Sequence, residues 1–206
     1  AENNDPVITR LDTTVINRAF VLQNPAQIKK SINSVAVVAE PAVSLIQVKD
    51  AKRGLHQALN AIHQQVMNQP DQKTTVAVLA RFNFLLGDGG PKELKLQMET
   101  QYPLLDLQFM SVHASKGKEA DYVVILGLCN GKYGFPSQKE GDPILEFLLP
   151  EKESFPDAEE RRLFYVALTR ARHRVYLVCN TTEVSPFIAE LIEQKYPVCS
   201  DEFTAK

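Results

Sequence analysis

Apolar and polar positions follow two different periods along this chain, and the change of period predicts strands interleaved with helices. Two short apolar runs rich in β-branched residues, Val43–Val48 and Thr75–Ala80, predict strands. Between them, the segment Asp50–Gln69 spaces its apolar residues three, four and seven positions apart, which predicts one amphipathic helix. The apolar positions of this helix are Leu55, Ala58, Leu59, Ile62 and Val66.

Three more strands are predicted further along, at Leu107–Val112, Tyr122–Leu128 and Val175–Cys179. The second of these runs is apolar throughout, which is typical of a strand covered on both faces in a parallel sheet. The segments 87–91 and 131–150 are rich in glycine, proline and charge, and they predict loops. A chain of 206 residues with this alternation predicts a single three-layer α/β domain with a mostly parallel sheet.

A helix is predicted to begin at Asp157, because an aspartate followed three positions later by Glu160 forms a capping box. The apolar stripe beyond it is Leu163, Val166 and Ala167, and the next position on that stripe is Arg170. Burial of an unpaired guanidinium is unfavourable, so Arg170 either reaches solvent or pairs with a carboxylate such as Glu159 or Glu160. Its permanent charge and planar fork also suit a phosphate on a partner domain.

Composition excludes some classes of protein. Apolar residues make up 44% of the chain and charged residues 23%, with a formal net charge of −2, so any DNA contact must be local. The three cysteines are widely spaced and lack a Cys-x-x-Cys pair, which argues against a disulfide framework or a zinc site. No apolar run is long enough to cross a bilayer and no signal-peptide pattern opens the chain. We therefore expect a cytoplasmic protein with no membrane partner.

The segment Ser111–Asp121 reads Ser-Val-His-Ala-Ser-Lys-Gly-Lys-Glu-Ala-Asp and follows a predicted strand. Loops at strand ends often bind the ligands of α/β folds. Gly117 permits a tight turn and close backbone approach, and His113 and Lys116 have side chains that contact phosphate. Taken alone, however, a lysine–glycine turn after a strand is usually only a turn.

This segment and Glu159–Arg172, in this order, resemble the last two signature motifs of the UvrD/Rep-type superfamily 1 DNA helicases. Those motifs belong to the second of two motor domains, called 2A. The short connection between Arg81 and His113 resembles the DNA helicase IV branch, since larger members carry an extra domain there. The resemblance implies a RecA-like domain of the P-loop NTPase type. It also implies that the first, ATP-gripping motor domain lies outside this chain.

The resemblance implies nucleotide-binding roles for several residues. Arg170 matches the arginine that touches the γ-phosphate of ATP held by the other domain, which implies an arginine finger. Glu119 would face the ribose of ATP, with Gly117 in the same loop. Arg10, which precedes a predicted helix at Thr13–Gln23, matches a second γ-phosphate contact, although an ordinary solvated arginine is the alternative. ATP and Mg²⁺ would be held mainly by the first motor domain.

The resemblance also implies contacts with single-stranded DNA from His113, Lys116 and Ser115. Arg81 would have a positioning role, and the Phe135-Pro136 pair would be a packing feature. The overall expectation is the C-terminal motor domain of an ATP-dependent DNA helicase, inactive as an ATPase by itself. Its partners would be single-stranded DNA and the N-terminal motor domain of the same protein. The alternative is a catalytically inactive RecA-like binding or regulatory module.

Overall fold

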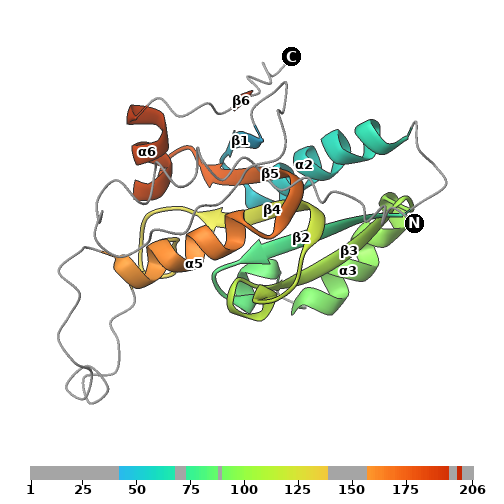
Figure 1. The fold of residues 1–206 in the computed structure, drawn as a ribbon, viewed down its shortest axis with the longest axis horizontal. Coiled ribbons are helices and arrows are strands. Elements are labelled where there is room, and N and C mark those ends of the chain that lie inside the picture. Colours follow the sequence, from blue (N-terminus) through green and yellow to red (C-terminus); the bar gives the residue numbers. More distant parts are fainter. Residues whose placement is uncertain (1–41, 68–72, 88–89, 139–156, 195–198, 201–206) are drawn as a thin grey trace, which may run out of the picture.

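Six parallel strands form one sheet in the order β3-β2-β4-β5-β1-β6 (Figure 1). This computed structural model describes residues 42–67, 73–87, 90–138, 157–194 and 199–200. The strands are β1 Val43–Val48, β2 Thr74–Ala80, β3 Leu105–Ser111, β4 Ala120–Leu128, β5 Ala171–Asn180 and β6 Cys199–Ser200. All five strands expected from the sequence are confirmed, as is the parallel sheet.

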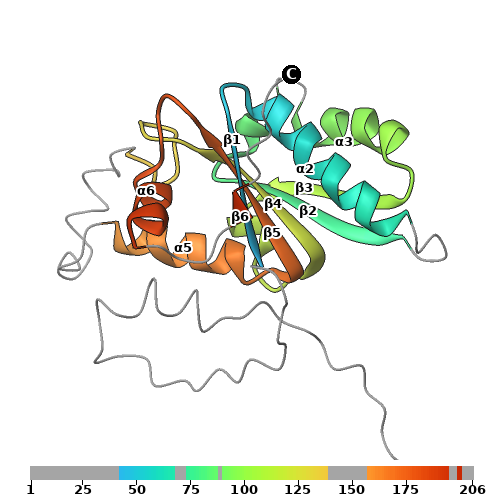
Figure 2. The same ribbon diagram turned by 90° about the horizontal axis from the view of Figure 1, so that it is seen from above.

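Helices cover both faces of the sheet, so the expected three layers are confirmed. In the described residues the α-helices are α2 Ala51–Val66, α3 Gly90–Gln101, α5 Ala158–Leu168 and α6 Pro186–Glu193. Two short 3₁₀ helices, η1 Asn83–Leu86 and η2 His113–Ser115, follow β2 and β3. Figure 2 shows α2 and α3 over one face, with α5 and α6 over the other. None of the described helices is long and apolar enough to span a bilayer.

Strand β4 shows how the two cores arise. Because side chains alternate along a strand, Val123 and Ile125 pack in the core under α5 and α6, whereas Val124 and Leu126 pack in the core under α2 and α3. All four side chains are buried. Double coverage therefore explains why the middle of this strand, Val123 to Leu126, is apolar at consecutive positions.

Helix α2 follows its predicted pattern. The Asp50 carboxylate accepts a hydrogen bond from the Lys52 amide at 2.9 Å and caps the first turn, and every predicted stripe residue is buried. Gly54 lies in the middle of the helix, where a Cβ would meet the Val178 and Val48 side chains at 2.4 and 2.8 Å. The glycine therefore lets α2 lie close to the sheet, despite its low helix propensity.

Two helices, α3 and α6, were not predicted from the sequence. The segment 87–91 was expected to be a loop, but α3 begins at Gly90. Its polar sequence buries few side chains, so its helical period is weak. Helix α6 carries a start signal that could have been read, since the Ser185 hydroxyl caps it and a proline follows. Residues 131–138 form neither helix nor strand, as expected. The predicted helix Thr13–Gln23 and Arg10 lie outside the described residues.

The two cysteines whose side chains are described, Cys129 and Cys179, are free thiols, as the sequence indicated. Burial raises the pKa of Cys179 to about 11. Burial, reinforced by the negative charge of Glu183, also raises the pKa of Cys129. Both thiols are therefore protonated near neutral pH and are poor nucleophiles.

Candidate functional site

The loop that carries the first motif runs from the carboxyl ends of the strands back to their amino ends. It leaves the carboxyl end of β3, where His113 opens η2, and it reaches the amino end of β4 just after Glu119. Because the strands are parallel, their carboxyl ends lie along one side of the sheet, called here the carboxyl edge. Their amino ends lie along the opposite side, the amino edge. The loop therefore separates its candidate residues, with His113 at the carboxyl edge and Glu119 at the amino edge.

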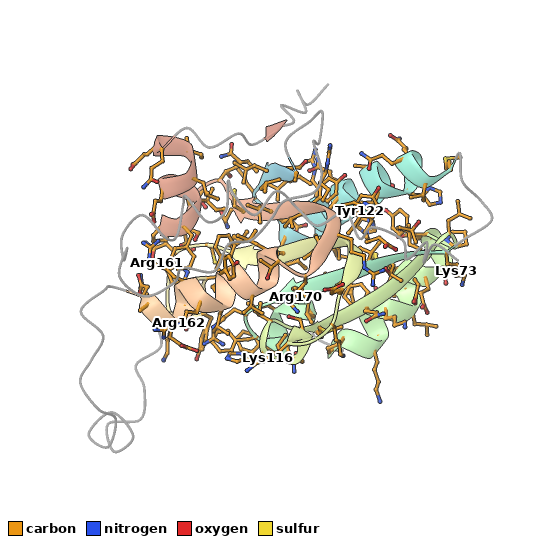
Figure 3. All side chains as sticks on the ribbon, in the orientation of Figure 1. Lys73, Lys116, Tyr122, Arg161, Arg162 and Arg170 are labelled. Atoms are coloured by element: carbon orange, nitrogen blue, oxygen red, sulfur yellow. The ribbon has the colours of Figure 1, made fainter. Side chains whose placement is uncertain are left out.

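Helix α5 also extends from the carboxyl edge to the amino edge of the sheet. Its first turn lies at the carboxyl edge, where Glu160 contacts the residue that follows β2, and the chain beyond its last turn reaches the amino end of β4. Figure 3 shows Arg161 and Arg162 at one end of α5 and Arg170 beyond the other. A helix of 11 residues is about 16 Å long. The loop and α5 therefore connect the same two edges.

Arg170 lies beyond the helix, not on its apolar stripe, because α5 ends at Leu168 with Thr169 as its cap. The buried stripe consists of Leu163, Phe164, Ala167 and Leu168. The expectation that the helix continues to Arg170 is therefore wrong. The Thr169 hydroxyl lies 3.0 Å from the Tyr165 carbonyl and 3.1 Å from the Val166 carbonyl, so it binds acceptors of the final turn.

Oxygen atoms without formal charge hold the Arg170 guanidinium. Its Nε donates to the Val166 carbonyl at 3.0 Å, its Nη1 to the Lys118 carbonyl at 3.2 Å and its Nη2 to the Thr169 hydroxyl at 3.2 Å. The Ala120 amide in turn donates to the Arg170 carbonyl at 3.0 Å. Across the part of the chain that the structure describes, no carboxylate pairs with Arg170. The guanidinium is fixed in place and keeps its positive charge.

The predicted carboxylate partners of Arg170 bind other arginines. Glu159 pairs with Arg162 at 3.3 Å on the exposed side of α5, and Glu160 pairs with Arg81 at 2.7 Å. The predicted capping box is also wrong. Asp157 has a positive φ of 56° and its side chain makes no capping hydrogen bond. Glu160 does not reach back to it, because its carboxylate turns toward Arg81.

Arg81 and Glu160 form a largely buried ion pair with several contacts at the carboxyl edge. The Arg81 Nε lies 2.9 and 3.0 Å from the two carboxylate oxygens of Glu160, and the Ser137 amide donates to one of them at 3.0 Å. The Arg81 and Glu160 side chains are only 16% and 12% exposed. The Arg81 Nη1 also lies 3.5 Å from the His113 Nδ1. This network holds Arg81 in place, and its positioning role stays a prediction.

The loop between the two edges gives its residues different environments. Ser115 is buried, and its hydroxyl donates to the Val112 carbonyl at 2.6 Å, so a DNA contact through that hydroxyl does not fit this structure. Lys116 and His113 are exposed. Gly117 has a φ of 80°, which favours glycine, and nothing lies near its missing Cβ. At the amino edge, the Glu119 carboxylate lies 3.5 Å from the Arg172 Nε.

Comparison with known proteins identifies the family. Residues 92–182, which run from α3 through β5, match the family model of the UvrD-like helicase C-terminal domain. This segment of the chain belongs to that family. The matched UvrD-like segment contains both the loop after β3 and the Arg170 segment. It therefore covers both edges described above.

Relatives of this UvrD-like domain support the same identification. The chain is 41% identical over 184 residues to DNA helicase IV of Escherichia coli K12, covering 89% of this chain and 25% of that protein. It is 26% identical over 160 residues to the ATP-dependent DNA helicase Rep of Buchnera aphidicola, covering 75% of this chain and 18% of that protein. The chain thus spans about a quarter or less of the length of these two relatives.

A solved structure supports the fold. The C-terminal domain of a possible DNA helicase from Lactobacillus plantarum WCFS1 superimposes with a TM-score of 0.51 at 15% identity. The match covers 94% of this chain and 98% of that one. At this identity the likeness concerns the fold alone, which is that of a RecA-like helicase C-terminal domain.

Proposed function

We propose that this domain is the second motor domain of an ATP-dependent DNA helicase and supplies an arginine finger to a cleft shared with the first. The observation that carries the proposal is the environment of Arg170. Three uncharged oxygen acceptors orient its guanidinium. Because none of them neutralises the positive charge, the guanidinium can bind an anion from outside this domain. A fixed guanidinium stabilises the negative charge that develops during transfer of a phosphoryl group.

The nucleotide would meet this domain at the amino edge of β4 and β5. Arg170 and the loop ending at Glu119 converge there, since the Arg170 Nη1 binds the Lys118 carbonyl at 3.2 Å. In this proposal Glu119 contacts the ribose of ATP, and Gly117 lets the backbone turn close by. The first motor domain would hold the phosphates and Mg²⁺. The Mg²⁺ ion would neutralise negative charge on the phosphate oxygens. Arg10 keeps its proposed γ-phosphate contact, although its position lies outside the described residues.

Single-stranded DNA would lie at the carboxyl edge. His113 and Lys116 are exposed there on η2 and the residue after it, and both side chains suit phosphate contacts without reading the base sequence. At Ser115 only the backbone would contact the DNA, because the side chain is buried. The loop and α5 both extend from this edge to Arg170, so a movement at the DNA site has two routes to the nucleotide site.

The proposal is tested with the full-length protein that carries this domain. It should unwind tailed duplexes with ATP and hydrolyse ATP faster when single-stranded DNA is present. The isolated 206-residue chain should show no ATPase activity above an Arg170→Ala control, because Glu119 and Arg170 line only one wall of the cleft. Failure of the full-length protein to hydrolyse ATP would favour a catalytically inactive binding or regulatory module.

Lys116→Ala in the full-length protein should weaken single-strand binding by removing one phosphate contact. The log–log dependence of affinity on salt should become shallower by about 0.7, the value for one contact on a single strand. Basal ATPase activity without DNA should stay unchanged, while stimulation by DNA should fall. Fluorescence anisotropy across a salt series measures the first effect, and a coupled ATPase assay measures the second.

Glu119→Gln is the matched comparison for Lys116→Ala, since it alters the other end of the same loop. It should weaken nucleotide binding and leave the salt dependence of DNA binding unchanged. An unchanged salt slope in Lys116→Ala would show that the exposed loop does not touch DNA. An equal effect of both variants on both ligands would show that the two edges are not separate sites.

A further inference from the structure

Three aromatic side chains gather at the carboxyl edge, beside the proposed DNA loop. Phe82 and Phe84 follow β2, and Tyr133 lies in the turn that follows β4. Strands β2 and β4 are neighbours in the sheet, so these two segments emerge side by side. Phe84 is 56% exposed and Tyr133 is 45% exposed. Exposure of such large rings is unfavourable in water, which makes a cluster of them a candidate binding surface.

The geometry of the cluster leaves the Phe84 ring accessible to solvent. Phe82 and Phe84 are stacked, with centroids 5.4 Å apart and planes 11° from parallel. Tyr133 is perpendicular to both, at 5.9 Å from Phe82 and 5.3 Å from Phe84. The three centroids are nearly equidistant, so the rings form one compact cluster. Since Phe84 keeps 56% exposure in this cluster, much of its ring is open to solvent.

Positive groups surround these rings. The Arg81 guanidinium lies 4.7 Å from the Phe82 centroid, and the Lys132 ammonium lies 5.5 Å from the Tyr133 centroid. Arg81 also contacts His113 at 3.5 Å, which joins the cluster to the proposed DNA loop. Glu160 already pairs with Arg81, so Lys132 is the cation beside the rings that can meet a phosphate. Aromatic rings next to such a cation match a single strand, whose bases have π faces and whose phosphates are anionic. An apolar contact with another protein would not require a cation beside the aromatic rings.

Backbone hydrogen bonds, a close glycine contact and a buried anchor hold the turn that carries Tyr133, which favours a cluster formed before any ligand binds. The Gly134 amide donates to the Gly131 carbonyl at 3.0 Å, and the Phe135 amide donates to the Cys129 carbonyl at 3.1 Å. A Cβ at Gly134 would meet the Cys129 carbonyl oxygen at 2.0 Å, so the turn closes only with glycine there. Phe135 is fully buried, packs edge-on against the stacked pair Phe164 and Phe187, and anchors the turn in the core.

We propose that Phe82, Phe84 and Tyr133 form a base-stacking platform for single-stranded DNA, with Phe84 as the ring on which a base stacks. The platform deepens the proposed function and rests on it. A base stacks on the exposed ring surface of Phe84, beside Phe82 and Tyr133. Lys132 at the rim and Lys116 in the neighbouring loop contact the phosphates on either side. The platform therefore contributes affinity by stacking, and it does so without sequence preference.

The test uses the full-length protein, a fluorescein-labelled single-stranded oligonucleotide and an abasic oligonucleotide of the same length. Phe84→Ala should weaken binding of the normal strand on the order of 5- to 100-fold, the range for loss of one stacked base. The abasic strand should bind the wild type and Phe84→Ala equally, because it has no base to stack. Phe84→Trp should restore binding of the normal strand. The salt slope should stay unchanged in Phe84→Ala, whereas Lys132→Ala should make it shallower by about 0.7.

Leu96→Ala is the matched control, since Leu96 is a 70% exposed apolar residue on α3 and should not affect either strand. Equal loss of both strands in Phe84→Ala, or no loss of either, overturns the platform. If Lys116→Ala still changes the salt slope in that case, the proposed function stands without the platform. If the wild type binds neither strand, the platform and the proposed function fail together.

Discussion

Arg170→Ala in the full-length protein is expected to reduce the turnover of ATP by a factor on the order of 10³ or more. An arginine finger acts on charge that develops as the phosphoryl group is transferred, so most of its effect lies in kcat. The affinity for ATP should change much less. Steady-state ATPase assays at saturating DNA, combined with binding of a fluorescent ATP analogue, separate the two quantities.

Two further variants show whether the charge or the fork of Arg170 is needed. Arg170→Lys should also fail, because an ammonium cannot reproduce the three directed hydrogen bonds to Val166, Lys118 and Thr169 or a bidentate phosphate contact. Arg162→Ala is the control, since Arg162 lies on the same helix but is 59% exposed and pairs with Glu159. A kcat within a few-fold of wild type in Arg170→Ala, with loss of thermal stability, would make Arg170 a structural residue.

The strands could be read from the sequence because both faces of the sheet are covered. Each residue from Val123 to Leu126 is buried on one face or the other, so the apolar run marks the strand directly. Helix α3 could not be read in the same way. Among residues 91–101, whose burial is described, only Met98 is buried, and a helix with so little buried surface leaves almost no period in the sequence.

The sequence selects candidate site residues by their type and motif, and it does not contain their geometry. The loop residues His113 to Glu119 look like a single cluster in the sequence, yet they connect opposite edges of a parallel sheet. Glu160 was read as a capping residue from its local spacing. Its actual partner, Arg81, lies 79 positions away, and a local pattern does not contain such a contact. The aromatic cluster was missed for the same reason, since Tyr133 meets Phe82 only through the pairing of β2 with β4.

The ion pair between Arg81 and Glu160 should be the polar contact with the largest effect on stability. Glu160→Gln leaves the Arg81 guanidinium largely buried with no full countercharge, and it weakens the bond to the Ser137 amide. We expect a loss of about 2–4 kcal/mol in the free energy of unfolding, below the range for fully buried pairs because both side chains keep some exposure. For a domain of this size, the loss corresponds to a fall in Tm of about 5–12 °C.

Glu159→Gln is the matched control for this prediction, because it changes the neighbouring residue on the same helix in the same way. The Glu159–Arg162 pair has side chains that are 71% and 59% exposed, so its loss should cost less than about 0.5 kcal/mol. Thermal unfolding followed by circular dichroism compares the two variants. The double variant Arg81→Met/Glu160→Gln should be more stable than the sum of its single variants, since it removes the unpaired charge. Equal melting temperatures for Glu159→Gln and Glu160→Gln would show that the Arg81–Glu160 pair does not stabilise the carboxyl edge.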